Sequence, residues 1–320
     1  MLTAYHPAER GLSTLPAGAD LATASWIDLC AASAEEEAAV RALGIEVPSL
    51  AEMEEIEVSN RLYHEDSADY LTVVLSGTDA AAEQVMGPVC LALTPERLVT
   101  IRHHTPRPFE TYPARAGKSS LGCSSPDRIF LGLVEEVIGR LADHLETAGR
   151  GLDEVSRTIY HPRPKGPRAT DLQAALAHLG SEGERLGRVR LALLTLGRAL
   201  NYVDQIVGHR LGADGLVQVL KAQLKDIEAL EVHADFLSSR LGLMSDATMG
   251  TINLAQNDTV RIVSVVSVLF LPPTLIASVY GMNFAAMPEL AQPWGYPLAL
   301  ALMVGSAVLA WVYFTWKGWL

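Results

Sequence analysis

Cysteines are scarce in this sequence, and several catalytic motifs are missing from it. Its three cysteines, Cys30, Cys90 and Cys123, form no Cys-X-X-Cys pair in 320 residues. This argues against a disulfide framework or a zinc knuckle, so we expect small buried apolar side chains there. The sequence also has no Gly-X4-Gly-Lys-Ser/Thr loop, no His-Glu-X-X-His pair and no identifiable Ser/His/Asp set. We therefore expect neither an enzyme nor an ATP-driven pump, and no cofactor.

Basic charge is also in short supply. Lys and Arg number 25 against 37 Asp and Glu, which gives a formal net charge of −12. Only 19% of residues are charged, where about 25% is usual for a soluble protein, and the mean hydropathy is +0.19. An acidic chain of this kind argues against a nucleic-acid partner and favours a surface that concentrates cations.

Formal charge is absent from two long stretches near the end of the chain. Residues 262–288 and 290–316 contain no Asp, Glu, Lys or Arg. Each stretch exceeds the roughly 20 apolar residues that cross a bilayer. Four of the five tryptophans fall near the expected span ends, as in an aromatic belt: Trp294, Trp311, Trp316 and Trp319. We predict spans at about 262–280 and 296–316; the alternative is a buried helical hairpin in a soluble protein.

The charge flanking these stretches predicts an orientation. The first residues lack the apolar core of a signal peptide, so we expect none. Two spans leave both ends on one side, and Arg261 and Lys317 flank the spans on that side, as the positive-inside rule requires. The sequence predicts a multi-pass protein of the cell (inner or plasma) membrane, with the N-terminal domain and the tail 317–320 in the cytoplasm.

The remaining 260 or so residues predict an α+β domain followed by long helices. Residues 1–120 mix strand-like runs at 25–30, 70–75 and 98–101 with a helix at 33–43 that has a serine cap. Residues 121–212 predict a helical hairpin, with helices at 127–150 and 170–207 separated by the proline-rich segment 160–167.

A long stalk helix is predicted over 213–280, running into the first span. No proline occurs between positions 215 and 271. Apolar or small residues recur in steps of three and four, at positions 227, 230, 234, 237, 241, 244, 248, 251 and 255. This is a heptad seam, whose partner is either the preceding helices or copies of the same chain. About 60 residues would make a rod on the order of 90 Å.

Polar or small side chains form one stripe along the same helix. The stripe, called the polar stripe below, consists of Asn257, Ser264, Ser267, Leu271, Thr274 and Ser278. Such hydroxyls can hold helices together within a membrane. Alternatively, several copies around an axis would turn each position into a ring that lines a pore, with Leu271 as an apolar collar that gates by dewetting.

The residues after the first span make the sequence recognisable. Gly-Met-Asn at 281–283 is followed by Met-Pro-Glu-Leu at 287–290 and Gly-Tyr-Pro at 295–297. Together with Pro-Pro-Thr-Leu-Ile-Ala at 272–277, Trp-Ile-Asp-Leu at 26–29 and the segment 55–63, this strongly resembles the CorA family of magnesium and cobalt channels. The resemblance covers nearly the whole chain.

The resemblance implies a homopentamer with a cytoplasmic funnel, and an external loop at 281–295 that selects the ion. Gly281 would let the backbone turn closely, Met282 would pack the loop, and Asn283 would present an amide oxygen to hydrated Mg²⁺. Asn257 could form a second, inner ring. Glu289 beside the entrance either concentrates cations or merely solubilises the loop.

The resemblance also implies that intracellular Mg²⁺ closes the channel, so Mg²⁺ would be both substrate and regulator. Asp246 is the position carried over as one regulatory ligand; the cluster Glu65, Asp66 and Asp69 holds candidates for its partner, or is a solvated turn. Val260 and Val263 stand where the family often has longer apolar residues, which implies a looser collar. Uptake would be driven by the membrane potential.

Two other functions remain open at this point. A Zn²⁺ transporter of the same superfamily would share Gly-Met-Asn, although neither spans nor loop contain the Cys or His that favour zinc. A membrane-anchored sensor or scaffold would need neither the polar stripe nor Asn283. The expected partners are Mg²⁺, Co²⁺, the lipid bilayer and further copies of the chain, with no nucleic acid.

Overall fold

The structure is a computed structural model that describes residues 1–8, 11–16, 18–160, 168–206, 215–282, 287–288 and 292–319. The chain divides into two compact units, which are described separately. The first contains Met1–Tyr160 and Ala175–Ser245, and the second contains His161–Ala174 and Asp246–Leu320. The elements confirm the expected class: an α+β domain, a long helix and two apolar C-terminal helices.

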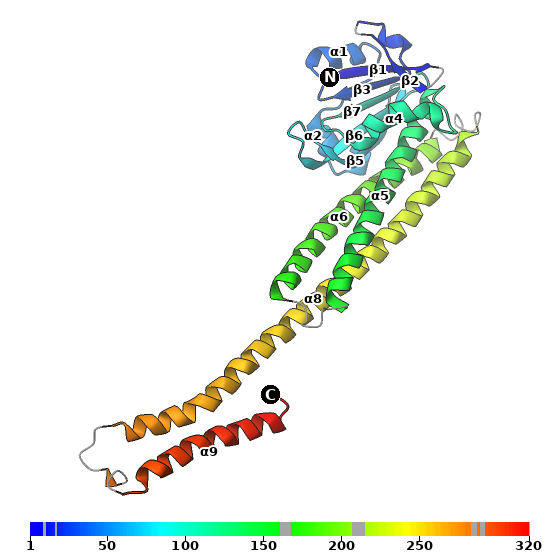
Figure 1. Cartoon of the computed structure of the whole chain (residues 1–320). Helices are drawn as coiled ribbons and strands as arrows, with labels where there is room; N and C mark the ends of the chain where they lie inside the picture. Colours follow the sequence, from blue (N-terminus) through cyan, green and yellow to red (C-terminus); the bar gives the residue numbers. More distant parts are fainter. Residues whose placement is uncertain are drawn as a thin grey trace. The chain divides into compact units, whose positions relative to one another are not determined.

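The first unit is built on a seven-stranded mixed sheet (Figure 1). Its strand order is β2-β1-β3-β7-β6-β5-β4. Only β3 and β7 pair in parallel; the other neighbours are antiparallel. The strands are β1 (Leu2–Ala8), β2 (Gly11–Thr14), β3 (Trp26–Cys30), β4 (Leu62–Glu65), β5 (Ala68–Thr78), β6 (Gln84–Leu93) and β7 (Leu98–Arg102).

Helices cover both faces of this sheet because strand residues alternate between the two faces. On one face, Ile27 of β3 belongs to an apolar cluster with Val40 and Met53 of the small helices. On the other, the ring of Trp26 contacts the rings of Phe109 and Tyr112, 6.3 and 5.9 Å away. The helices concerned are α1 (Ala34–Arg41), α2 (Leu50–Glu54), α3 (Val58–Arg61) and α4 (Arg107–Arg115), with single turns η1 (Leu21–Thr23) and η2 (Ala116–Lys118).

A buried ion pair crosses from β3 to β7. Nη2 of Arg102 lies 2.8 Å from Oδ2 of Asp28, and both side chains are less than a tenth exposed. The same guanidinium donates to Sγ of Cys30 at 3.1 Å. Cys90 and Cys123 are buried as expected, but Cys30 is half-buried and accepts a charged hydrogen bond, so the expectation of a simple apolar side chain is wrong for Cys30.

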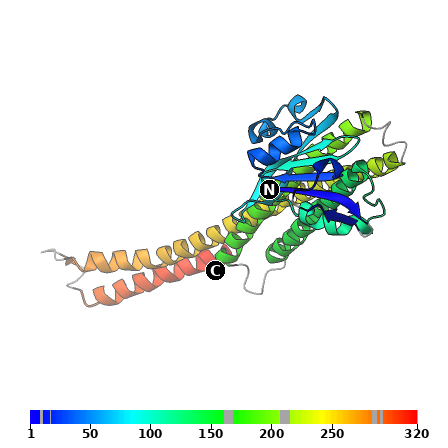
Figure 2. The same ribbon diagram turned by 90° about the horizontal axis from the view of Figure 1, so that it is seen from above.

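Three long helices pack together beside the sheet (Figures 1 and 2). They are α5 (Pro126–Tyr160), α6 (Ala169–Ile206) and α8 (Leu216–Tyr280), of which α8 continues for 65 residues. In the first unit, Gln223 of α8 donates to the backbone oxygen of Leu131 in α5 at 2.8 Å. Arg240 of α8 pairs with Asp153 of α5 at 2.6 Å.

This packing answers the question that the heptad seam left open in the first unit. Seam residues Ile227, Ala234, Leu237 and Met244 are buried there, at most 7% exposed. A Cβ added at Gly197 of α6 would lie 3.4 Å from Ile227, so glycine allows the two helices to approach closely. In this part of α8 the seam therefore packs against helices of the same chain.

Candidate ion pathway

Among the described residues, two helices are long and apolar enough to cross a membrane: α8, whose part from Asp246 onward belongs to the second unit, and α9 in that unit. The end of α8 and α9 (Gly295–Trp316) lie side by side (Figures 1 and 2). Apolar side chains on both are largely exposed in the single chain, for example Leu275 at 65% and Leu309 at 74%. Helices that are apolar around most of their circumference require lipid or protein to cover them.

The polar stripe lies on α8 and is accessible along most of its length. Leu271 is 64% exposed, and Val263 at the inner part of the stripe is 60% exposed. Asn257, Ser267, Thr274 and Ser278 are exposed as well, while Ser264 is half-buried. All these side chains are therefore available either to a neighbouring copy or to an aqueous path.

Three hydroxyl groups of the stripe donate their protons to their own helix. Ser264 Oγ donates to the Val260 oxygen at 2.8 Å, and Ser267 Oγ donates to the Val263 oxygen at 2.8 Å. Thr274 Oγ1 lies 2.9 Å from the oxygens of both Phe270 and Leu271. A hydroxyl whose proton is engaged in this way still has lone pairs that accept hydrogen bonds from outside. The stripe thus offers acceptors, which suit the outward-pointing protons of water bound to a cation.

Two adjacent prolines add further acceptors in the same turn of the helix. Pro272 and Pro273 lie inside α8. Because proline has no N–H, the carbonyl groups of Val268 and Leu269, four residues earlier, lose their usual helical donors. The turn next to the Leu271 position is accordingly richer in carbonyl acceptors than an ordinary apolar helix.

The loop that the sequence predicts to select the ion begins where α8 ends. The Gly281 N–H donates to the Ala277 oxygen at 2.9 Å, and a Cβ at position 281 would lie 3.1 Å from that oxygen, which is a tight contact. Met282 follows and is 49% exposed. Asn283 and Glu289 lie outside the described residues, so their predicted roles stay predictions.

Asp246 and Asn257 occupy the same side of α8, because eleven residues bring a helix round to within about 20° of its starting direction. Both are exposed, and within the described part of the chain neither makes a side-chain hydrogen bond or ion pair. Of the candidate partners for Asp246, Glu65 and Asp66 are exposed. Asp69 is buried, and its carboxylate is held by Nδ1 of His64 at 2.8 Å.

No group of three His, Cys, Asp or Glu side chains that could hold a metal ion is found among the described residues. The candidate residues contribute one polar group each along an exposed helix face. A ring of such groups requires several chains, because a single helix cannot surround an ion.

An exposed apolar stripe on α8 is the feature that sequence analysis missed. Val232, Leu243 and Leu254 are 71%, 65% and 67% exposed, and they follow one another at intervals of eleven residues. This interval keeps them on one face of the helix. The interval of eleven residues is present in the sequence, but the heptad seam on the opposite face of α8 is the stronger pattern and was the one recognised.

Comparison with known proteins identifies the family. A family model described as CorA-like Mg²⁺ transporter protein matches residues 22–316. The magnesium transport protein CorA of Pasteurella multocida is 36% identical over 303 residues, which cover 94% of each chain.

Solved structures agree on the fold. The CorA magnesium transporter from Methanocaldococcus jannaschii superposes with a TM-score of 0.74 at 17% identity, covering 100% of this chain and 99% of that chain. The ZntB cytoplasmic domain from Vibrio parahaemolyticus gives a TM-score of 0.57 at 11% identity, covering 78% of this chain and 97% of that domain. From the sequence matches and the shared fold we conclude that the chain belongs to the family of CorA-like Mg²⁺ transporter proteins.

Proposed function

We propose that this chain forms a homo-oligomeric channel, expected to be a pentamer, that conducts Mg²⁺ and also Co²⁺ across the cell membrane. The observation that carries the proposal is the polar stripe on a helix apolar enough to cross the bilayer. Membership of the CorA-like family supports Mg²⁺ as the ion.

The chemistry of the stripe suits an ion that keeps its water. Mg²⁺ loses its bound waters reluctantly, so a pathway that holds the hydrated ion avoids a large dehydration cost. Water bound to Mg²⁺ points its protons outward, and the hydroxyl oxygens of Ser264, Ser267 and Thr274 are free to accept them. At the outer entrance, the amide oxygen of Asn283 would accept hydrogen bonds from the same water molecules.

Self-association is supported by exposed apolar surface on α8. Val232, Leu243 and Leu254 form a stripe that nothing covers in the described part of one chain. Burying an apolar side chain of this size contributes roughly 1.5–3 kcal/mol, so a repeated stripe favours contact between copies. Packing several α8 helices about an axis would bring their polar stripes together.

The direction of cation movement and its control by internal Mg²⁺ both follow from electrostatic interactions. With the first unit in the cytoplasm, a divalent cation moving inward gains about 4.6 kcal/mol per 100 mV, which is twice the value for a single charge. Asp246, whose carboxylate has no ion pair with any residue that the structure describes, lies on the α8 face shared with Asn257. Mg²⁺ bound there between subunits would neutralise repelling carboxylates and favour a closed state.

The test is Mg²⁺ uptake into proteoliposomes with an inside-negative potential, at internal Mg²⁺ from nominally zero to millimolar. We expect uptake that stops when the potential is dissipated and that falls as internal Mg²⁺ rises. The Asn283→Ala variant, shown to be folded and oligomeric, should lose most of this flux. Absence of flux for the unmodified chain at every internal concentration would overturn the proposal, and parallel vesicles with external Zn²⁺ would then test zinc transport.

A further inference from the structure

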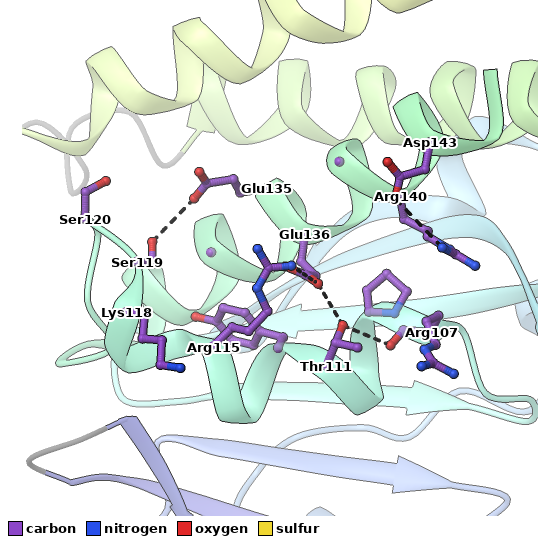
Figure 3. Close-up of a pocket in the computed structure, with 14 residues that line it drawn as sticks. Arg107, Thr111, Arg115, Lys118, Ser119, Ser120, Glu135, Glu136, Arg140 and Asp143 are labelled. Carbon is purple, nitrogen blue, oxygen red and sulfur yellow. Dashed lines mark hydrogen bonds and ion pairs between the residues drawn. The ribbon is translucent and has the colours of Figure 1, made fainter. Parts of the chain in front are cut away.

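A polar cavity in the first unit lies far along the chain from the ion pathway. It has a volume of about 740 Å³ and is formed by α4, η2, the loop after η2 and the first half of α5 (Figure 3). Four cationic side chains line it: Arg107, Arg115, Lys118 and Arg140. Three carboxylates face them, from Glu135, Glu136 and Asp143. Four positive against three negative charges leave a net of +1 among the lining residues, in a chain of net charge −12.

One cation of the cavity forms a close ion pair with a hydrogen bond. Oε1 of Glu136 accepts hydrogen bonds from Nη1 of Arg115 at 2.9 Å and from Oγ1 of Thr111 at 2.8 Å. Figure 3 shows this trio in the middle of the cavity, with Arg107 and Arg140 towards one end and Lys118 and Ser119 towards the other. The central pair cancels its own charge and holds α4 against α5.

The other three cations have donors to spare. Arg140 lies 3.8 Å from Asp143, and Arg107 lies 3.8 Å from Glu110; both distances are too long for a hydrogen bond. Lys118 makes no ion pair with any residue that the structure describes, and its side chain is exposed. Guanidinium and ammonium groups with unused donors bind phosphate oxygens strongly, in the case of arginine through two parallel hydrogen bonds.

The shape of the cavity depends on glycines in α5. Gly139 lines the cavity with nothing within 4 Å of the place where a Cβ would lie, so a larger side chain would project into open space there. A glycine inside a helix costs about 1 kcal/mol relative to alanine, so an open wall is retained at the expense of helix stability.

Tyr112 also lines the cavity and carries an unsatisfied polar group. Its side chain is 2% exposed, and its Oη has no hydrogen-bond partner among the described residues. Burial raises the pKa of this phenol, so it keeps its proton at neutral pH and remains a donor.

From the unused cationic donors around an open cavity, we propose that this site binds a small phosphate-bearing anion, such as a nucleotide or pyrophosphate. Lys118, Arg140 and Arg107 provide the charge. Ser120, beside Lys118, adds a hydroxyl group at one end, where Ser119 Oγ already donates to Oε2 of Glu135 at 3.5 Å. The site is separate from the polar stripe, so the proposal stands whether or not the chain conducts Mg²⁺. An intracellular phosphate compound would then be a second ligand of the protein.

The test is isothermal titration of the full-length protein in detergent with ATP and with inorganic pyrophosphate, both in EDTA and at physiological ionic strength. We expect saturable binding of about one ligand per chain. The double variant Lys118→Ala/Arg140→Ala should bind at least tenfold more weakly, because two charge-assisted contacts are lost. Gly139→Leu keeps every charge but projects an apolar side chain into the cavity, and should also weaken binding.

The matched control is Arg150→Ala, which removes an exposed arginine of the same helix that pairs with Glu146 outside this cavity. Its affinity should stay within about twofold of the unmodified chain. Thermal unfolding checks that all variants are folded, and Mg²⁺ flux of the double variant should be unchanged. No saturable binding of either probe at millimolar concentration, or equal losses in the control and the cavity variants, would overturn the proposal.

Discussion

Thr274 allows the proposed ion pathway to be tested with a change of one atom. Thr274→Val replaces Oγ1 by a methyl group of nearly the same shape. The hydroxyl donates to the oxygens of Phe270 and Leu271, each 2.9 Å away, and its lone pairs are open to the exposed side of α8. The substitution removes an acceptor for water bound to the ion without opening a cavity.

The size of the effect follows from the net value of one hydrogen bond. A net contribution of about 0.5–1.5 kcal/mol per bond corresponds to a fall in flux of about twofold to about tenfold if one hydroxyl acts at a time. If hydroxyls from several chains contact the hydrated ion together, the losses multiply. Thr274→Ser keeps the oxygen and should retain flux close to that of the unmodified chain.

A matched control lies in the other span. Thr315 Oγ1 of α9 donates to the Trp311 oxygen at 2.8 Å, so it makes the same kind of helical hydrogen bond but does not belong to the polar stripe. Thr315→Val should leave flux unchanged. The assay is potential-driven Mg²⁺ uptake into proteoliposomes with equal amounts of folded protein. Equal flux for Thr274→Val and Thr315→Val would refute the assignment of the stripe to the pathway.

Three further predictions concern control and stability. Asp246→Asn removes the carboxylate that we propose as a regulatory ligand, so its Mg²⁺ uptake at millimolar internal Mg²⁺ should stay within about twofold of its uptake at zero; inhibition like that of the unmodified chain would contradict this. Asp28→Ala leaves a buried guanidinium without its partner, at a cost of about 3–5 kcal/mol, and should lower the unfolding midpoint by about 6–20 °C in tryptophan fluorescence. In the same measurement Arg150→Ala, from an exposed pair worth about 0–1 kcal/mol, should change the midpoint little, and equal shifts would disprove the reasoning. Gly132→Ala would place a Cβ 2.5 Å from Tyr112 Oη and should lower the free energy of unfolding by about 1–3 kcal/mol. Adding Tyr112→Phe should restore part of that stability. A double variant no more stable than Gly132→Ala would contradict the predicted clash.

The features predicted well from the sequence are those set by local pattern. The loss of charge after Arg261 indicates the spans because no tertiary contact is needed to explain it. The helix at 33–43 was likewise predictable. Ser33 Oγ accepts from the Glu36 N–H, and Glu36 accepts from the Ser33 N–H, so the cap is formed by two residues only three positions apart in the sequence.

The features that were missed depend on distant contacts. Strand β6 contains Gly87 and Pro88, which usually mark a loop or an edge strand. In the fold, Pro88 pairs with Val74 of β5, but the pairing of β6 with β7 begins only at Val89, so Pro88 faces no β7 residue that would need its missing N–H. The residue at which the β7 pairing ends is decided by the register of the folded sheet, so no local pattern reveals that an interior strand tolerates this proline.

In the candidate site, too, features set by local pattern were predicted and features set by distant contacts were not. The positions of the polar stripe follow from helical periodicity alone, and the structure places its members on an exposed face of α8. The partner of the heptad seam did not follow from spacing. It was decided by side-chain details such as the room that Gly197 leaves for Ile227. Whether Asp246 binds Mg²⁺ depends on neighbouring chains, which one sequence does not describe.

The contacts of α8 with α5 restrict how α8 can move. Gln223 bonds to the Leu131 oxygen, and Arg240 pairs with Asp153, so two polar contacts 17 residues apart fix the axial register of the two helices. A slide of one residue is about 1.5 Å, enough to break both contacts at once. Piston-like translation of α8 against α5 is therefore disfavoured. A conformational signal that reaches Tyr280 must bend or rotate α8 beyond Arg240, or carry α5 along with it.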